Sequence, residues 1–161
     1  MKSVFSVLLL LVAISFPIRA FADNKLPSEA ADALHASSKV ILYSLEPWSL
    51  ATTNDNTLHH YKILGQVTLD GKDAATAITV FESAISKKEH LGHATCFDPR
   101  HALRVTVNSQ TYDFLLCYAC GYLYVYHGDK VIAMLDAGGS PTVLNSLLTA
   151  AKIPLSKSGE Q

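Results

Sequence analysis

The amino-acid sequence predicts one α+β domain, an antiparallel sheet of about five to six strands with helices packed on one face. Four apolar and aromatic segments follow one another after residue 101 with short connections, which are typical of antiparallel neighbours. Ala74, Ile78, Phe81 and Ile85 follow at steps of three or four, as on one face of a helix. A chain of 161 residues also suits one domain.

The first half of the chain is expected to contain two helices and two strands. Pro27-Ser28-Glu29 is a typical helix start, and Glu46-Pro47 is expected to end the first strand. Gly65 is a candidate for a bulge in the second strand, and Asp70-Gly71 is the turn into the longest helix. The predicted elements are a helix over 27–37, strands over 40–45 and 61–69, and a helix over 73–90.

The second half is expected to be β-rich and to finish with a helix. Asn108-Ser109-Gln110 and Gly128-Asp129-Lys130 supply turn residues between strands. Ser140 and Pro141 suit the cap and the first position of a last helix. The predicted elements are strands over 102–107, 112–119, 121–127 and 131–135 and a helix over 141–151, which is expected to bury Val143, Leu144, Leu147 and Leu148.

Residues 1–22 have the three parts of a secretory signal peptide, which divides the chain into a signal (1–22) and one domain (23–161). Lys2 supplies the positive start, and an apolar stretch from Val4 to Ile14 follows. That stretch is shorter than the ~20 residues a membrane span needs. Ala20-Phe21-Ala22 is a typical cleavage signal. We expect a periplasmic or secreted protein without a membrane anchor.

The composition argues against several classes of function. The whole chain has 13 basic and 14 acidic residues, and two of the basic ones lie in the predicted signal. A nucleic-acid partner is therefore not expected, because such proteins present a basic face. The sequence has no G-x-S-x-G elbow, H-E-x-x-H motif or glycine-rich phosphate loop. These observations favour a binding protein over an enzyme.

Three cysteines, Cys96, Cys117 and Cys120, are the most informative residues for chemistry. A redox C-x-x-C pair normally begins a helix, whereas this one lies between strand-like segments. An extended backbone would hold the α-carbons of Cys117 and Cys120 about 10 Å apart. A disulfide tolerates about 7 Å, so a bond between them needs a turn that Gly121 would help to form.

Two further arrangements of the cysteines stay open. A bond from Cys96 to one of the pair would close a loop of ~20 residues, worth about 3 kcal/mol in the chain-entropy model, and an oxidising compartment favours it. Alternatively, the cysteines and His101 would hold zinc in a four-ligand site. The disulfide candidates are Cys96, Cys117 and Cys120, and the zinc candidates are Cys96, His101, Cys117 and Cys120.

The segment CFDPRHALRVTVNSQTYDFLLCYAC resembles one found in exported bacterial proteins of unknown function. Those proteins carry Cys-aromatic-x-Pro-Arg-His, then a hairpin that ends in Cys-aromatic-x-Cys. The matching residues are Cys96, Phe97, Pro99, Arg100, His101, Cys117, Tyr118 and Cys120. In a second block, LHHYKILG, the residues His59, Tyr61, Leu64 and Gly65 match, whereas Leu58 and His60 depart. The resemblance implies that the cysteines and His101 belong to one site.

Alternating tyrosines in the third predicted strand of the second half form a candidate binding surface. Tyr122, Tyr124 and Tyr126 would share one face of the sheet. Tyrosine gives a large contact area at low entropic cost, although such ladders also serve as cross-strand packing. Arg100 and His59 are further candidates for this surface.

Together these features predict a small exported protein that acts by binding. One version is an inhibitor or immunity-type protein that binds a protein partner in the periplasm. The alternative is a zinc-binding or thiol/disulfide-site protein that uses the cysteines and His101.

Overall fold

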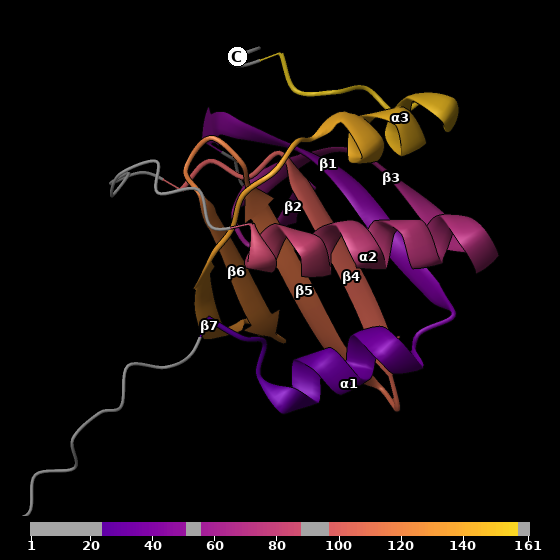
Figure 1. The fold of residues 1–161 in the computed structure, drawn as a ribbon. Coiled ribbons are helices and arrows are strands. Elements are labelled where there is room, and N and C mark those ends of the chain that lie inside the picture. The colour runs from indigo at the N-terminus through magenta and orange to yellow at the C-terminus, as the bar shows by residue number, and fades with distance from the viewer. Residues whose placement is uncertain (1–23, 51–55, 88–96, 158–161) are drawn as a thin grey trace, which may run out of the picture.

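The computed structural model describes residues 24–50, 56–87 and 97–157, with the side chains of residues 47–50 left out. The predicted signal peptide and Cys96 lie outside the described residues. Within them the chain forms three helices and seven strands (Figure 1). The helices are α1 (Ser28–Ala36), α2 (Gly71–Ser86) and α3 (Thr142–Ala150), and the strands are β1 (Lys39–Leu50), β2 (Thr57–Leu58), β3 (Tyr61–Asp70), β4 (His101–Val107), β5 (Gln110–Cys117), β6 (Tyr122–His127) and β7 (Lys130–Asp136).

The strands form one curled antiparallel sheet in the order β2-β3-β1-β4-β5-β6-β7. The predicted α+β class and antiparallel pairing are therefore confirmed. The predicted count of five to six strands is wrong, because β2 adds a seventh strand at the edge. A sequence of only two residues, Thr57 and Leu58, is too short to show a strand pattern.

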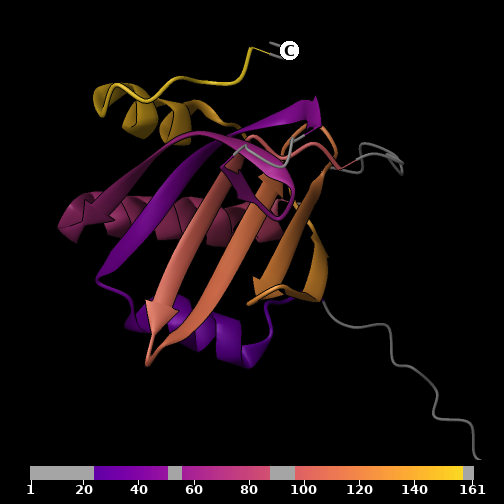
Figure 2. The ribbon, with the colours of Figure 1, turned by 180° about the vertical axis from the view of Figure 1, so that it is seen from behind.

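Two clusters of apolar side chains lie on opposite faces of this sheet. The larger cluster joins the buried faces of all three helices, through residues such as Leu34, Phe81 and Leu148, to inward-facing strand residues such as Phe114. In Figure 2 the other face of the sheet is toward the viewer, and α1 and α2 lie behind it. The smaller cluster on this face includes Tyr43, Leu45, Leu58, Ala102 and Leu115. We refer to the two sides as the helix face and the open face.

Glu46-Pro47 does not end β1, contrary to the sequence prediction. The strand continues to Leu50, and its register with β3 shifts between Glu46 and Leu50. Proline is tolerated at such an irregularity because no regular ladder hydrogen bond is needed from its nitrogen. In addition, the pairing of β1 with β4 covers only Ile41 to Ser44.

Gly65 lies beside a bulge, as predicted from its place in a strand. Ser44 pairs with Gly65 while the next residue, Leu45, pairs with Ile63, so one residue of β3 has no direct partner. A Cβ at Gly65 would lie 2.7 Å from Cγ2 of Ile153. The glycine thus lets the segment after α3 approach β3 closely.

Two further details of the helices differ from the predictions. Helix α2 ends at Ser86, earlier than the predicted residue 90. Val143 is 42% exposed, so its predicted burial is wrong, whereas Leu144 and Leu148 are fully buried. None of the helices in the described part of the chain is long and apolar enough to cross a membrane.

Candidate functional site

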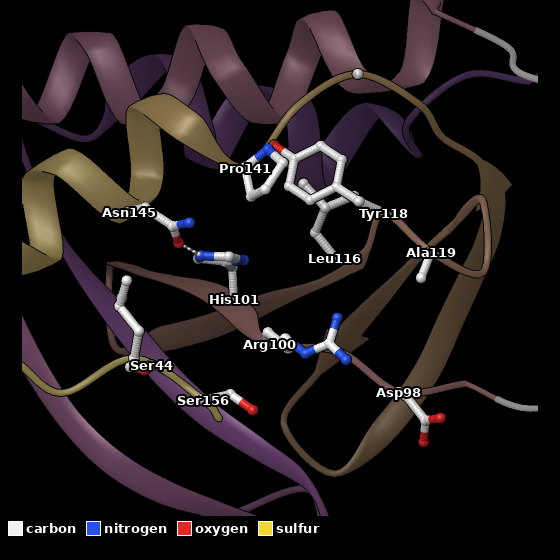
Figure 3. A pocket seen from close by; sticks show the side chains of 12 residues that line it. Ser44, Asp98, Arg100, His101, Leu116, Tyr118, Ala119, Pro141, Asn145 and Ser156 are labelled. Atoms are coloured by element: carbon white, nitrogen blue, oxygen red, sulfur yellow. Dashed lines mark hydrogen bonds between the residues drawn. The ribbon is translucent and has the colours of Figure 1, made fainter. Parts of the chain in front are cut away.

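A pocket of about 510 Å³ opens at the end of the sheet next to α3 (Figure 3). Its wall comes from the sheet, from the turn between β5 and β6, from α3 and from the segment after it. The lining residues are Ser44, Asp98, Arg100, His101, Leu116, Tyr118, Ala119, Gly139, Pro141, Asn145, Leu155 and Ser156.

Strand register brings the floor of this pocket together. His101 begins β4 and pairs with Ser44 of β1 on one side and with Leu116 of β5 on the other. The ladder extends one step beyond β4, because the N–H of Leu45 donates to the carbonyl of Arg100 over 3.0 Å. Arg100 and His101 are thus held by backbone pairing, which makes the site rigid at its base.

The last helix and the segment after it complete the wall. Leu144 and Leu148 are fully buried and anchor α3 on the helix face, which places Asn145 over the floor. After the helix, the hydroxyl of Ser156 donates to Oε1 of Glu46 on β1 over 3.0 Å. This hydrogen bond holds the segment after α3 against β1 beside the pocket.

His101 is the central polar group of the pocket and is only 4% exposed. Its Nε2–H donates to Oδ1 of Asn145 over 2.7 Å. Burial lowers the pKa of His101 to about 4, and the nearby positive charge of Arg100 adds to this effect, although the bond to Asn145 opposes it. The imidazole is therefore neutral at pH 7. Its second nitrogen, Nδ1, is buried and has no hydrogen-bond partner among the described residues.

Tyr118 supplies the second unpartnered polar atom of the pocket. Its hydroxyl oxygen is buried and bonds to no described residue. Burial raises the pKa of Tyr118 to about 12, so the group stays a neutral O–H donor. Its ring meets that of His101 edge to face, with centroids 6.1 Å apart. A buried polar atom without a partner costs free energy, so these two atoms make the pocket the candidate site.

Cys117 and Cys120 are joined by a disulfide, with their α-carbons 5.3 Å apart. The turn that the sequence required for this bond is present. Gly121 adopts a φ of +73°, and its N–H donates to the carbonyl of Cys117 over 3.0 Å. The bond from Cys96 to one of the pair, which the sequence left open, does not form in this structure, because each sulfur of the pair is already used.

The disulfide also bears on the predicted zinc site, because it joins two of the four proposed ligands to each other. Zinc binds thiolates, which a disulfide does not provide. His101 meanwhile bonds to Asn145, and no group of three or more His, Cys, Asp or Glu residues in the described part of the chain has a metal-binding arrangement. The set Cys96, His101, Cys117 and Cys120 therefore stays a prediction that a measurement of zinc content tests. His101 does line the same pocket as Tyr118 and Ala119, the two residues between the bonded cysteines.

The predicted tyrosine surface lies on the open face, where two of its rings are covered. Tyr124 stacks on Phe97 with ring centroids 3.9 Å apart. Tyr126 stacks on His59 with centroids 3.6 Å apart. Cross-strand and loop packing thus use part of this surface. Arg100, which the sequence grouped with the tyrosines, lines the pocket instead.

His59 belongs to a buried polar cluster on the open face, which the sequence did not reveal. Its Nε2 donates to Oδ2 of Asp113 over 2.7 Å, and Arg104 binds both oxygens of the same carboxylate over 2.6 and 2.8 Å. Burial would raise the pKa of Asp113, but hydrogen bonds from Arg104 and His59 outweigh it and hold that pKa below its usual value. The guanidinium also lies over the ring of Tyr43. We call these residues the Asp113 cluster.

Sequence reasoning missed Asn145 and did not assign Tyr118 a role beyond its motif position. Asn145 has no sequence neighbour that marks it, since it lies between buried leucines on a short helix. The helix also carries Thr142, Ser146 and Thr149, so its polar residues did not single out Asn145. The Asp113 cluster gave little local signal, because Arg104 and Asp113 become opposite neighbours only through the β4–β5 register.

The fold and the pocket define a small α+β domain with a polar site at one end of its sheet. A search of protein-family models, of curated proteins and of solved structures found no match to this chain. The resemblance to exported bacterial proteins therefore stays a prediction.

Proposed function

We propose that this protein is a small exported binding protein that holds a small polar molecule in the pocket around His101. One observation carries the proposal: Nδ1 of His101 and the hydroxyl of Tyr118 are both buried in the wall of the same pocket and have no partner among the described residues. A ligand that donates to the first and accepts from the second would remove both unfavourable free energies. In this proposal the three helices cover one face of the sheet, and the pocket opens beside α3.

Two features support an exported location. Residues 1–22 have the pattern of a signal peptide. The Cys117–Cys120 disulfide also suits an oxidising compartment, because cytosolic reductants keep most thiols reduced.

The neutral imidazole of His101 and the protonated hydroxyl of Tyr118 favour recognition of a ligand by hydrogen bonds.

The test is recovery of a bound molecule from protein purified from its producing cells. The protein is denatured, and released small molecules are identified by mass spectrometry. Ala119, an exposed pocket residue, is replaced by tryptophan to fill the site without disturbing the core. Asp129→Trp, in the exposed β6–β7 turn, is the matched control. We expect one compound to accompany the wild type and the control but not Ala119→Trp; equal recovery from all three would contradict the proposal.

A protein partner in the periplasm is a second candidate, and one observation favours it. Met134 and Val131 of β7 are 60% and 45% exposed, and they pair with Tyr124 and Tyr126 on the open face. An inhibitor or immunity-type protein would present such apolar side chains to its target. We expect Met134→Lys to abolish recovery of a specific periplasmic partner while Lys130→Glu retains it. Recovery that is unchanged by Met134→Lys would eliminate this surface.

A further inference from the structure

The charged side chains that line the pocket are of both signs. Asp98 and Arg100 belong to the same lining, and Arg100 already interacts with another group. The rings of His101 and Tyr118 are uncharged at pH 7, because burial lowers the pKa of the first and raises that of the second. A ligand with a net charge would approach one side chain of its own sign, and the lining has no excess of the opposite sign to compensate. The pocket therefore suits an uncharged ligand.

His101 requires a hydrogen-bond donor from that ligand. Its Nε2–H already donates to Oδ1 of Asn145, so the proton is on Nε2 and Nδ1 keeps a lone pair. Nδ1 is buried and has no partner in the described part of the chain. A neutral O–H or N–H on the ligand would supply the missing bond.

Tyr118 and Asn145 require the opposite, a hydrogen-bond acceptor. The hydroxyl of Tyr118 is a buried O–H without a described partner. The amide of Asn145 uses its oxygen for His101, so it can only donate from its N–H₂ end. The ring centroids of Tyr118 and His101 are 6.1 Å apart, so the acceptor and the donor of the ligand must lie close together. A hydroxyl group meets both requirements at one oxygen atom.

Asp98 distinguishes neighbouring hydroxyls from a single amide group. Its backbone N–H donates to Sγ of Cys120 over 3.3 Å, which holds the residue beside the disulfide turn. Its carboxylate can only accept, so it adds a second requirement for a donor. In Figure 3, Asp98 and Asn145 lie on opposite sides of His101. A peptide-type amide has one N–H, whereas hydroxyls on neighbouring carbons supply a donor toward each side.

The rest of the lining accommodates an organic ring. Leu116, Pro141 and Leu155 give part of the wall an apolar character, and the pocket volume is about 510 Å³. This volume lies within the range of ~300–1,000 Å³ that is common for small-molecule pockets. The C–H groups of a cyclic polyol can pack on such a wall, because their surface is then removed from water.

We propose that the pocket binds an uncharged cyclic polyol, such as a neutral monosaccharide, through hydroxyl groups on neighbouring carbons. One hydroxyl donates to Nδ1 of His101 and accepts from Tyr118. Its neighbours accept from the amide of Asn145 and donate to the carboxylate of Asp98. This inference rests on the proposed function, since it names the ligand class of the same site.

The experiment follows the two ring nitrogens of His101 by ¹⁵N NMR while probes are added to the full chain. D-glucose, D-galactose and D-mannose are the neutral polyols. The uronate of each sugar adds a negative charge, its 2-amino derivative adds a positive charge, and N-methylacetamide offers one amide. We expect at least one neutral sugar to shift the Nδ1 resonance and to bind about tenfold or more tightly than its own uronate, its own 2-amino derivative and the amide.

Variants give a second measurement. Tyr118→Phe removes a donor to the sugar and Asp98→Ala removes an acceptor, and each is expected to weaken binding of that sugar about tenfold or more. His127→Gln changes an exposed ring nitrogen bond on β6, away from the pocket, and should leave affinity unchanged. A cooperative thermal transition shows that each variant is folded. Unchanged affinity in both Tyr118→Phe and Asp98→Ala would overturn the proposal.

The outcomes separate this inference from the proposed function. If a uronate, a 2-amino sugar or N-methylacetamide shifts His101 as strongly as the neutral sugars do, the pocket binds ligands but the polyol class is wrong. If no probe shifts His101, the compound that accompanies the wild type and not Ala119→Trp decides: an uncharged polyol supports the class, and any other compound overturns it. If no probe and no co-purified compound reaches the pocket, the proposed function fails with it.

Discussion

The pocket and the Asp113 cluster both bury polar side chains, but they differ in how completely those side chains are hydrogen-bonded. On the open face, Asp113 accepts three hydrogen bonds from Arg104 and His59, and its charge is balanced. In the pocket, Nδ1 of His101 and the hydroxyl of Tyr118 meet no described partner. A saturated network contributes to stability, whereas an unsaturated one is what a ligand can complete. The difference supports a structural role for the Asp113 cluster and agrees with the binding role proposed for the pocket.

Removing the carboxylate of Asp113 should have the largest effect on stability. Asp113→Ala leaves Arg104 without its main partner in a site where Asp113 is 1% exposed. Loss of one partner of a buried pair destabilises a protein by about 3–5 kcal/mol. The free energy of unfolding in urea measures this change. Asp129→Ala, on an exposed turn, is the control and should change it by less than about 0.5 kcal/mol. Equal values for the two variants would show that the cluster is not structural.

His101 should make the protein less stable in mild acid. Its pKa is 6.5 in an unfolded chain and about 4 in the folded protein, so between these pH values the unfolded chain binds the extra proton. Stability is therefore complete above pH 6.5 and falls as the pH drops toward 4, by about 3 kcal/mol at most.

The measurement for His101 is a series of urea unfolding curves between pH 7.5 and 3.5 (roughly one per half unit), compared with His101→Gln. In His101→Gln the free energy of unfolding should depend much less on pH within this window. The lowered pKa of Asp113 acts at more acidic pH, because its stabilisation is present above the ordinary value of 3.8 and is lost below it. An unchanged slope in His101→Gln would show that His101 is not the titrating group.

Reduction of the Cys117–Cys120 disulfide should have an intermediate effect. The bond closes a short loop, for which the chain-entropy model gives about 2 kcal/mol. Because Tyr118 and Ala119 lie within that loop, we also expect faster hydrogen exchange at Gly121 after reduction. The Asp113 cluster serves as the internal control, since the exchange of strand amides around it should change little. Faster exchange throughout the sheet would mean that the disulfide supports the whole fold.

Tyr118→Phe should have the smallest effect on stability and the opposite sign. The hydroxyl of Tyr118 is buried without a described partner, so its removal should raise the free energy of unfolding by about 1 kcal/mol. Thermal unfolding without ligand measures the gain. Tyr43→Phe, on the open face beside Arg104, is the comparison and should not stabilise the protein. Destabilisation by Tyr118→Phe would show that its hydroxyl has a structural bond and would remove one support of the pocket proposal.

Local sequence patterns were enough to predict the α+β class, the place of most helices and strands, and the bulge beside Gly65. These follow from local patterns: apolar spacing along α2, alternation along β6 and turn residues between strands. The condition that the sequence set for a Cys117–Cys120 bond, a turn at Gly121, is met.

Contacts between residues far apart in the sequence could not be predicted and became visible only in the folded chain. Asn145 reaches His101 across 44 positions of sequence, and His59 reaches Asp113 across 54, because helix packing and strand register place them together. The choice of disulfide partner likewise depended on how tightly the chain turns after β5, which residue types alone do not fix. Burial then determined the chemistry: a histidine that would titrate near neutral pH in water is held neutral in the wall of a pocket.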